Sequence, residues 1–294
     1  SRPLDKERDT LEPYIDKLIL EIELLKKIVK KKKFKVEAVY IGGGTPTSIP
    51  HELFKKLIKK CKFGQKEFTV EAGRPDTIDI KKVKIMKRYG VTRVSVNPQS
   101  FNERTLKAIG RGHSIEDIIK AYNLCRKHFI VNMDLIAMLP GEGFDDFKFS
   151  VDKAVELNPE NISIHTLYLK KGSKLKVEGY EHEDAEEAKK MTSYAVYKLK
   201  SAGYVPYYMY RQKYTAGNLE NVGYSKPDKI CKYNIDIMEE NTSILAAGAN
   251  AISKKYTNDE NLIERQAHVK EPGEYINRFD EIIKKTKEFW DYDK

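Results

Sequence analysis

Glycine and polar residues follow several apolar runs of this sequence, and their types and spacing are suited to ligand binding. One run ends at Ile41 and is followed by three consecutive glycines and Thr45. Glycine permits positive φ angles and a close approach of the backbone to a ligand. The loop has neither the lysine of a phosphate loop nor the GxGxxG spacing of a dinucleotide site. It is a candidate ligand site, with an ordinary glycine-rich strand end as the alternative.

Two carboxylates and an amide lie beside other apolar runs. Glu71 can accept hydrogen bonds from ribose hydroxyls, and an ion pair with Arg74 in a surface turn is an equal alternative. Gln99 and Asp134 lie on or next to apolar runs. Because a buried carboxylate is costly unless it is paired or binds a ligand, we interpret Asp134 as a functional residue.

Arg111 precedes a predicted helix that begins after Ser114, with Asp117 as the acid of a capping box. Its guanidinium can hold a carboxylate through two parallel hydrogen bonds. We interpret His113 as a structural loop histidine. His165, at a later strand end, is a candidate catalytic residue, but no serine or cysteine nucleophile motif accompanies it. The pattern favours a binding site over a nucleophile-based triad.

The three cysteines Cys61, Cys125 and Cys231 are too sparse for a disulfide framework, which favours a reducing, cytoplasmic setting. Residues 1–30 contain neither the apolar core of a signal peptide nor a transit-peptide pattern, and no apolar run approaches the roughly 18 residues of a membrane span. We therefore expect a cytoplasmic protein without a membrane span.

The composition describes a globular chain with an excess of basic residues. Its 294 residues are 40% hydrophobic and 33% charged, with a net charge of +10. This charge favours anionic partners such as nucleic acid, phosphates or polycarboxylates. The basic run at residues 30–35 is interpreted as a solvated helix end. A nucleic-acid partner would require a continuous basic stripe with exposed aromatic residues and is not expected.

The order of predicted elements indicates an α/β fold. An amphipathic helix is predicted over residues 11–29. Short runs rich in β-branched residues occupy 36–41, 68–71, 93–96, 131–136 and 161–165, and helical stretches occupy 50–60, 80–89, 114–127 and 144–157. This alternation predicts a mostly parallel sheet, with ligands at the carboxyl ends of the strands.

Past residue 170 the pattern changes to an α+β extension that we expect to close one side of a barrel. It comprises a charged helix at 184–201, a tyrosine-rich segment at 204–214, two Gly/Asn-rich loops and a last helix at 274–289. Tyr208 and Tyr210 alternate in the tyrosine-rich segment. Ordinary strand packing is favoured for them over contact with a ligand.

Taken together, these segments resemble the radical S-adenosylmethionine superfamily, in particular its oxygen-independent coproporphyrinogen III oxidases. The resemblance runs from Tyr40 to about Ser253. Its main segments are residues 42–47, 94–101, 134–141 and 172–175, while 71–76 and 217–224 are similar to a clostridial and bacillar subgroup. The resemblance implies a partial, open parallel β/α barrel over residues 1–170, followed by the α+β extension over 171–294.

The resemblance also assigns roles to the residues at the strand ends. It implies that the amino-acid end of S-adenosylmethionine is held by Gly42, Gly43, Gly44 and Thr45. It implies that the ribose, adenosine and methionine portions are contacted by Glu71, Gln99, Arg111 and Asp134.

The implied reaction is the oxidative decarboxylation of two substrate propionates to vinyl groups, which gives protoporphyrinogen IX in haem biosynthesis. In the family a [4Fe-4S] cluster, bound by three cysteines in CxxxCxxC, leaves one iron open to S-adenosylmethionine. Electron transfer from reduced flavodoxin or a ferredoxin-type donor breaks the sulfonium bond. The resulting 5′-deoxyadenosyl radical abstracts hydrogen from a propionate. Carbon dioxide and a further electron then leave.

This sequence departs from the family because it contains no CxxxCxxC, and its three cysteines cannot imitate that spacing. We expect a chain that lacks the first barrel strand and the cluster loop, and that is inactive as it stands. A truncated sequence, a missing segment and a naturally shortened protein remain alternatives. The strand that ends near Gly42 should then have an unpaired edge.

A haem or tetrapyrrole carrier of the same fold is the alternative function. A haem chaperone related to the family carries the motif HNxxY, and the nearest match here is Tyr233–Ile237. Tyrosine replaces the histidine and isoleucine replaces the tyrosine, which disfavours this interpretation. A tetrapyrrole with four carboxylates is compatible with the net charge and with Arg211, Lys213 and Lys226.

Overall fold

The computed structural model describes residues 8–168, 184–211, 215–257 and 262–292. The chain divides into two compact units by its internal contacts. Unit 1 comprises Ser1–Val39, Ile49–Glu67 and Glu239–Lys294, and unit 2 comprises Tyr40–Ser48 and Phe68–Met238. The predicted boundary between residues 170 and 171, the motif at 172–175 and Lys213 all lie outside the described residues, and the boundary stays a prediction.

Unit 2 is built on a sheet whose strand order is β1-β2-β3-β4-β5-β7-β6. The strands are β1 (Ala38–Ile41), β2 (Glu67–Glu71), β3 (Arg93–Ser95), β4 (Ile130–Ala137), β5 (Asn161–Thr166), β6 (Val205–Arg211) and β7 (Glu220–Ser225). Strands β2 to β5 pair in parallel, whereas β7 pairs antiparallel with both β5 and β6. The predicted α/β class with a mostly parallel sheet is confirmed. Among the described strands, β1 lies at one end of the order.

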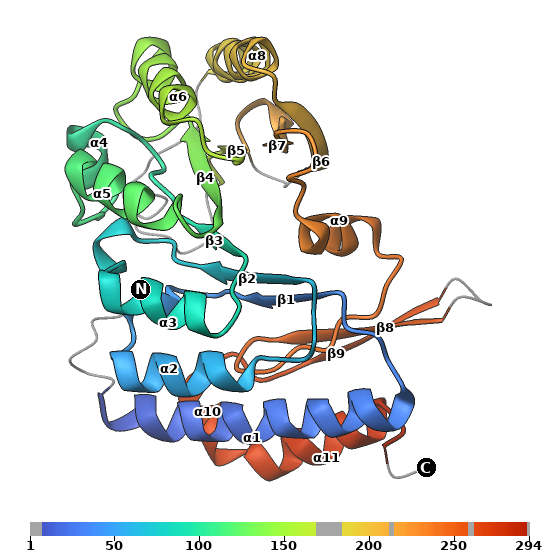
Figure 1. Cartoon of the computed structure of the whole chain (residues 1–294). Helices are drawn as coiled ribbons and strands as arrows, with labels where there is room; N and C mark the ends of the chain where they lie inside the picture. Colours follow the sequence, from blue (N-terminus) through green and yellow to red (C-terminus); the bar gives the residue numbers. More distant parts are fainter. Residues whose placement is uncertain (1–7, 169–183, 212–214, 258–261, 293–294) are drawn as a thin grey trace. The chain divides into compact units, whose positions relative to one another are not determined.

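Helices connect the strands of unit 2, as expected for βα units (Figure 1). They are α3 (Ile80–Arg88), α4 (Glu103–Ala108), α5 (Ile115–Cys125), α6 (Phe144–Leu157) and α8 (Ala185–Ser201), and a further helix, α9 (Lys232–Glu239), follows β7. Short 3₁₀ turns follow β1, β2 and β6 at η2 (Pro46–Ser48), η3 (Pro75–Thr77) and η4 (Ala216–Asn218). The loops that precede α3 and α4 therefore begin at the carboxyl ends of the parallel strands β2 and β3.

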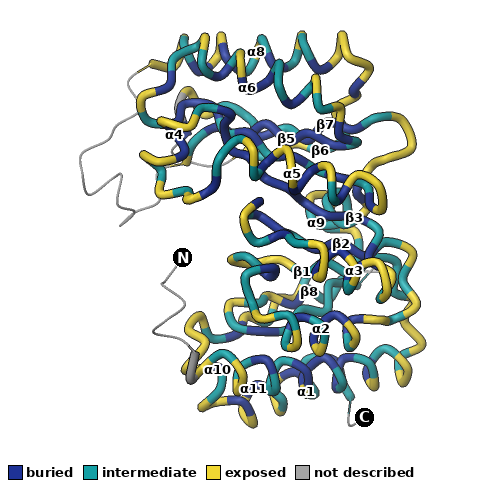
Figure 2. The backbone as a smooth tube through the Cα atoms, turned by 60° about the vertical axis from the view of Figure 1, so that its left-hand side comes forward, coloured by how far each residue is buried: buried dark blue, intermediate teal, exposed yellow. Residues whose placement is uncertain are grey.

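The strands of unit 2 carry different side chains on their two faces. Because successive residues of a strand point to opposite faces, alternation of polar and apolar residues separates the two kinds. On β4, Met133, Leu135 and Ala137 are buried, and Leu135 and Ala137 pack in one cluster with Ile162 and Ile164 of β5. This cluster also receives apolar side chains of α6 and α8. Figure 2 shows the buried strands in dark blue and the exposed outer faces of α6 and α8 in yellow. Polar residues occupy the opposite face of the sheet.

Unit 1 contains four helices and a hairpin among its described residues. The helices are α1 (Arg8–Lys32), α2 (His51–Lys60), α10 (Pro272–Asn277) and α11 (Phe279–Phe289), and the antiparallel hairpin is β8 (Ile252–Thr257) with β9 (Leu262–Ala267). Helix α1 packs against α2, α10 and α11. Leu24, Leu25 and Ile28 of α1 pack with Trp290 to form a buried cluster. No described helix combines the length and hydropathy needed to cross a membrane.

The structure corrects several predictions in the C-terminal half. The last helix is not continuous, because Arg278 has φ −103° and ψ 22°, and it separates α10 from α11. One predicted Gly/Asn-rich loop contains strand β7, which continues the sheet of unit 2 together with β6. The hairpin β8–β9 was not predicted either, nor was the short helix α4 in the N-terminal half. The α+β extension therefore contributes to both units.

Gly223 on β7 is required by a close contact with a tyrosine ring. It pairs in register with Tyr208 of β6, and a Cβ atom there would lie 1.8 Å from Tyr208 Cε1. We expect Gly223→Ala to lower the free energy of unfolding by about 2 kcal/mol, because the ring must move out of its position. Urea denaturation tests this. The control is Gly273→Ala, where a Cβ meets nothing within 4 Å. Equal stability of the two variants would contradict the expectation.

Candidate functional site

The polar face of the unit 2 sheet lines a cavity of about 160 Å³. Its lining residues come from strands β1 to β6 and from the segment that contains α9. They are Tyr40, Thr69, Arg93, Val94, Ser95, Asn132, Asp134, Asn161, Ser163, His165, Tyr207, Tyr208, Cys231 and Asn234. The alternation of β4 and β5 places every second residue of these strands on this face, and these residues are polar.

Asp134 is the carboxylate of this cavity. Asn132 Nδ2 donates to Asp134 Oδ1 at 2.7 Å, and His165 Nε2 lies 3.7 Å from the same oxygen. Burial raises the pKa of Asp134. The interactions with His165 and the hydrogen bonds from Asn132 and Ser163 outweigh this, so its pKa lies below the ordinary value. Asp134 is therefore a stabilised negative charge within the polar face.

His165 is oriented by a tyrosine of the neighbouring antiparallel strands. Its Nδ1 lies 3.3 Å from Tyr210 Oη, and its Nε2 faces Asp134. The ring thus joins Tyr210 to Asp134. This placement supports His165 as a residue of the site. Its contacts with Tyr210 and Asp134 are those of a residue that orients the Asp134 carboxylate.

Glu71 and the glycine loop contact each other within electrostatic reach of Asp134, but they are not among the residues that line the cavity. The Gly43 N–H donates to Glu71 Oε2 at 3.2 Å. A Cβ at Gly42 would lie 2.5 Å from Tyr40 Cε1 and 2.8 Å from Glu71 Oε2, so only glycine fits there. Gly43 and Gly44 have φ angles of 81° and 60°, as the predicted positive-φ loop requires. The loop backbone and the Glu71 carboxylate therefore lie against each other.

Electrostatics distinguishes Glu71 from Asp134. The pKa of Glu71 is raised, first by burial and then by the negative charge of Asp134, against the opposing effect of the Gly43 N–H and Arg111. The alternative pairing of Glu71 with Arg74 is not found, because Arg74 instead makes a two-point contact with Asp76. The two carboxylates therefore have pKa values shifted in opposite directions.

Gln99 continues the parallel pairing beyond β3. Its N–H donates to the Asp134 carbonyl at 2.9 Å, and its carbonyl accepts from Ile136 N–H at 3.0 Å. It is buried, with a φ angle of 69°. These bonds fix the Gln99 backbone directly beside Asp134, as the prediction of a shared strand-end site requires.

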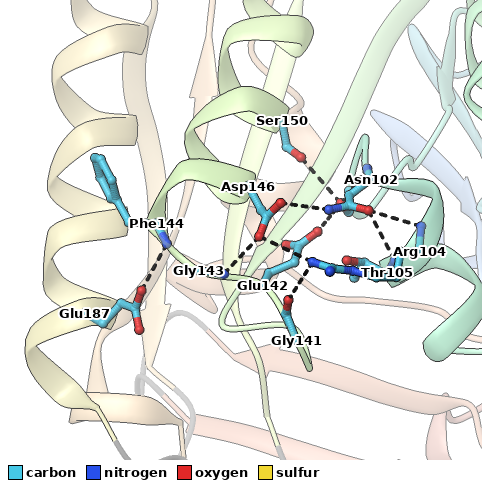
Figure 3. Close-up of polar contacts among 11 residues, drawn as sticks. Asn102, Arg104, Thr105, Gly141, Glu142, Gly143, Phe144, Asp146, Ser150 and Glu187 are labelled. Carbon is cyan, nitrogen blue, oxygen red and sulfur yellow. Dashed lines mark hydrogen bonds and ion pairs between the residues drawn. The ribbon is translucent and has the colours of Figure 1, made fainter.

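A polar network holds the segment after Gln99 against the segment after β4 (Figure 3). Asn102 Nδ2 donates to Asp146 Oδ1 at 2.8 Å, and Phe101 N–H donates to Ser150 Oγ at 2.9 Å. Ser100 Oγ donates to the buried Glu142 carboxylate. Burial raises the pKa of Glu142. This network holds the loop that contains Gln99 against the first turns of α4 and α6.

Arg111 lies at the entrance to α5 and reaches the loop that follows β2. Its Nη1 donates to the Gly73 carbonyl at 2.7 Å. Its pKa is lowered, chiefly by burial and by Arg74, and the charges of Asp134 and Glu71 oppose this shift. Ser114 and Asp117 form the predicted capping box of α5. His113 is buried, as the structural interpretation expects.

The structure thus brings most of the predicted residues together. Asp134 affects the pKa of both Glu71 and Arg111, these two affect each other's pKa, and Gln99 is bonded to the Asp134 backbone. Gly42 and Gly43 contact Glu71. The Thr45 carbonyl instead accepts from Ser48 N–H and Ser48 Oγ, so it closes the η2 turn. The roles of all eight residues toward a ligand remain proposals.

Sequence reasoning missed the tyrosines that close the cavity. A β-bulge between Pro206 and Tyr208 interrupts the register of β6, and both Tyr207 and Tyr208 line the cavity as a result. Tyr208 Oη lies 3.2 Å from Ser163 Oγ, and Asn234 Nδ2 donates to Tyr207 Oη at 2.9 Å. A bulge has no clear sequence signal, which is why strand packing was favoured for Tyr208.

The amino ends of the central strands are also closed by polar contacts. Arg93 donates to Asn161 Oδ1, to the Lys229 carbonyl at 2.8 Å and to the Ile230 carbonyl at 3.1 Å. Tyr233 stacks on Tyr40 with ring centroids 4.1 Å apart. Arg93 is therefore fully engaged in the structure and is not a free group for a ligand.

The glycine loop and the polar side chains near it offer backbone and charged groups to a polar ligand, whereas the described residues offer no set of ligands for an iron-sulfur cluster. The close approach of Gly42 to Tyr40 and Glu71 leaves no room for a side chain at Gly42, whereas the space beside Gly43 and Gly44 is open. In contrast, the described residues contain no group of three metal-ligating side chains. Cys61, Cys125 and Cys231 are each buried, and burial raises the pKa of Cys61 and Cys125 to about 12. These described cysteines do not form a cluster site.

Glu71→Gln should stabilise unit 2 at neutral pH. Because the folded-state pKa of Glu71 is raised, its contribution to stability is full below its unfolded pKa and is lost as pH rises through the folded pKa. The uncharged glutamine avoids that loss. Urea denaturation at about pH 4 and about pH 7 should show a gain that is larger at the higher pH. A gain of the same size at both pH values would contradict the assigned burial of Glu71.

Comparison with known proteins places this geometry in a family. Residues 8–154 match the Radical SAM superfamily. The chain is 42% identical over 270 residues to the oxygen-independent coproporphyrinogen-III oxidase-like protein HemZ of Bacillus subtilis (strain 168), which covers 88% of this chain and 54% of HemZ. It is 31% identical over 155 residues to the heme chaperone HemW of the same organism, covering 50% of this chain and 41% of HemW.

A solved structure shows the same fold. The coproporphyrinogen III oxidase HemN from Escherichia coli, a radical SAM enzyme, superposes with a TM-score of 0.67 at 20% sequence identity. The match covers 93% of this chain and 64% of that chain. The chain spans about half the length of the two relatives given above, HemZ and HemW. The predicted partial parallel barrel is confirmed by this likeness, and the chain belongs to the radical SAM superfamily.

Proposed function

We propose that this chain is the S-adenosylmethionine-binding part of a radical SAM oxidoreductase of the oxygen-independent coproporphyrinogen III oxidase type. The observation that carries the proposal is the close approach of the Gly42 and Gly43 backbone to the Glu71 carboxylate, within electrostatic reach of Arg111 and Asp134. It combines a backbone surface with two acids and a guanidinium at the carboxyl ends of parallel strands, where α/β folds bind ligands. The 42% identity to HemZ supports the oxidase type.

The residues of this site suit the chemical groups of S-adenosylmethionine. Glu71 accepts hydrogen bonds from ribose hydroxyls, and Arg111 holds the carboxylate of the methionine portion. Asp134 and the Gln99 backbone face the remaining polar atoms. The Gly42–Thr45 loop borders the amino-acid end. When bound, S-adenosylmethionine supplies the carbon-sulfur bond that is broken in the reaction of this superfamily.

The proposed substrate is a tetrapyrrole whose propionates are converted to vinyl groups, as for coproporphyrinogen III. Its four carboxylates are compatible with the net charge of +10. The cavity of about 160 Å³ is smaller than a tetrapyrrole and is lined by hydroxyl and amide groups. We propose a reduced flavodoxin or ferredoxin-type protein as electron donor.

A haem-binding function is the second candidate, supported by the similarity to HemW. The segment that is nearest to HNxxY does lie at the cavity, because Asn234 lines it. However, Tyr233 takes the histidine position and its ring is stacked on Tyr40. The oxidase type is therefore favoured over the carrier.

Calorimetric titration of the chain with S-adenosylhomocysteine, and separately with haemin, distinguishes the two candidates. S-adenosylhomocysteine has the same nucleoside and amino-acid groups as the proposed ligand. We expect one saturable site for it, weakened by Arg111→Lys because an ammonium group cannot reproduce the planar contact. Saturable haemin binding without S-adenosylhomocysteine binding would favour the carrier.

The oxidase reaction itself is tested on the complete gene product under anaerobic conditions. We expect iron and sulfide to be present after reconstitution, and vinyl groups to form from coproporphyrinogen III. A reconstituted protein that cleaves S-adenosylmethionine but leaves the propionates intact would contradict the proposed substrate.

A further inference from the structure

Lys82 on α3 is a buried lysine whose ammonium group contacts two loops of the site. It is 7% exposed, and burial lowers its pKa against the opposing charge of Asp79. Its Nζ donates to the Thr47 carbonyl and, at 3.3 Å, to the Thr77 carbonyl. Burying a lysine costs free energy unless its ammonium group makes hydrogen bonds, and here two backbone carbonyls accept hydrogen bonds from it.

Those two carbonyls belong to the turns that follow β1 and β2. Thr47 lies in η2, directly after the glycine loop, and Thr77 lies in η3, directly after the Glu71–Gly73 segment. The two turns are also joined by their side chains, since Thr47 Oγ1 lies 2.6 Å from Thr77 Oγ1. Thr77 Oγ1 donates to the Arg74 carbonyl at 2.7 Å. Lys82 therefore contacts both turns at a point where they already meet.

The same two loops meet a second time at the proposed ligand site. There the Gly43 N–H donates to Glu71 Oε2, and the Gly73 carbonyl accepts from Arg111. The glycine loop and the β2 loop are thus fixed relative to each other at two places. One is the ligand-binding end and the other is the Lys82 end.

We propose that Lys82 is a positioning residue that holds the glycine loop and Glu71 in the arrangement that binds S-adenosylmethionine. This inference rests on the proposed function. Lys82 contacts the loops through their turns and reaches no predicted ligand-binding side chain. Its role is to fix the relative position of the backbone N–H groups and the Glu71 carboxylate before the ligand arrives, which reduces the ordering that binding requires.

The neighbouring lysines of α3 provide matched controls. Lys81 and Lys84 are exposed on the same helix. Lys82→Met keeps the length and apolar stem of the side chain and removes the ammonium group. Lys81→Met and Lys84→Met remove the same charge from the surface. Lys82→Arg keeps a positive charge with several hydrogen-bond donors, and it tests whether another cationic side chain can replace Lys82.

The first measurement is amide hydrogen exchange of the ligand-free chain. We expect Lys82→Met to accelerate exchange at residues 43–48 and 72–77, with little change in β4 and β5. Unchanged exchange in those two loops, or acceleration throughout unit 2, would overturn the proposal. This measurement does not depend on ligand binding.

The second measurement is the dissociation constant for S-adenosylhomocysteine. We expect Lys82→Met to weaken binding about tenfold, Lys82→Arg to restore most of the affinity, and the two control variants to bind as the wild type does. Equal affinity of folded Lys82→Met and Lys81→Met would overturn the proposal. If the wild type does not bind, the proposed function is contradicted, and the exchange pattern alone decides whether Lys82 fixes the loops.

A variant of another residue, Thr77→Val, tests the proposal if Lys82→Met does not fold. Thr77→Val removes the side-chain bond to Thr47 and leaves Lys82 in place. We expect faster exchange in the same two loops and an intermediate loss of affinity. Wild-type behaviour of Thr77→Val in both measurements would overturn the inferred linkage between the turns.

Discussion

Gly42→Ala is expected to reduce S-adenosylhomocysteine affinity by at least on the order of 100-fold, about 2.7 kcal/mol. The added Cβ would lie 2.5 Å from Tyr40 Cε1 and 2.8 Å from Glu71 Oε2. Real Cβ atoms do not approach other atoms so closely, so the loop or the Glu71 carboxylate must move. Either movement separates the backbone of the glycine loop from the Glu71 carboxylate. These two groups together form the proposed nucleoside site. Calorimetry measures the loss.

Gly73→Ala is the matched control for this variant. A Cβ there would lie 3.9 Å from the Gly44 carbonyl, an ordinary contact in the adjacent loop. We expect it to retain most of the affinity. If both variants bind equally well, the close packing of Gly42 against Glu71 has no role in ligand binding, and the assignment of this loop is wrong.

Asp134→Asn is expected to have the second-largest effect on binding, a loss of at least about tenfold. Asn132 and His165 stabilise the carboxylate of Asp134, and its charge in turn raises the pKa of Glu71. Removing the charge eliminates an acceptor of hydrogen bonds and changes the titration of its neighbour. We therefore also expect the pKa of Glu71 to fall in the variant, which carbon NMR of its carboxyl group measures.

The control is Asp228→Asn, an exposed aspartate with a φ angle of 60° that asparagine readily adopts. We expect it to affect neither the affinity nor the pKa of Glu71. A lower affinity of Asp134→Asn with an unchanged pKa of Glu71 would mean that the two carboxylates act independently. Unchanged affinity would remove Asp134 from the site.

Local sequence patterns predicted the parallel part of the fold well. The runs at 93–96 and 131–136 correspond to β3 and β4. Strands rich in β-branched residues and helices with apolar residues at helical spacing can both be recognised directly in a sequence. The capping box at Ser114 likewise marked the start of α5. These features depend on interactions between residues that are near in sequence.

The features that were missed depend on contacts between distant residues. The helix break at Arg278 lies inside an otherwise helical pattern, and strand β7 lies in a segment whose glycine and asparagine residues favour a loop. Gly223 is explained only by the ring of Tyr208 on the neighbouring strand. Such positions become interpretable once the strand pairing is known.

The candidate site was partly predictable for the same reason. Glu71 and Asp134 stood out as single carboxylates beside apolar runs. Asn132, Asn161 and Ser163 were missed, although their alternation with apolar residues on β4 and β5 was a usable signal for a second, polar face. Lys82 had no such signal, because it is one of several lysines on α3 and only its burial distinguishes it.

Amide hydrogen exchange of the wild-type chain with and without saturating S-adenosylhomocysteine tests the central claim most directly. The claim is that the loops after β1, β2 and β3 together form the binding site. We predict slower exchange at residues 42–45, 71–74 and 99–101, and no change in the β8–β9 hairpin. Saturable binding that protects only other segments, or the absence of binding, would contradict it.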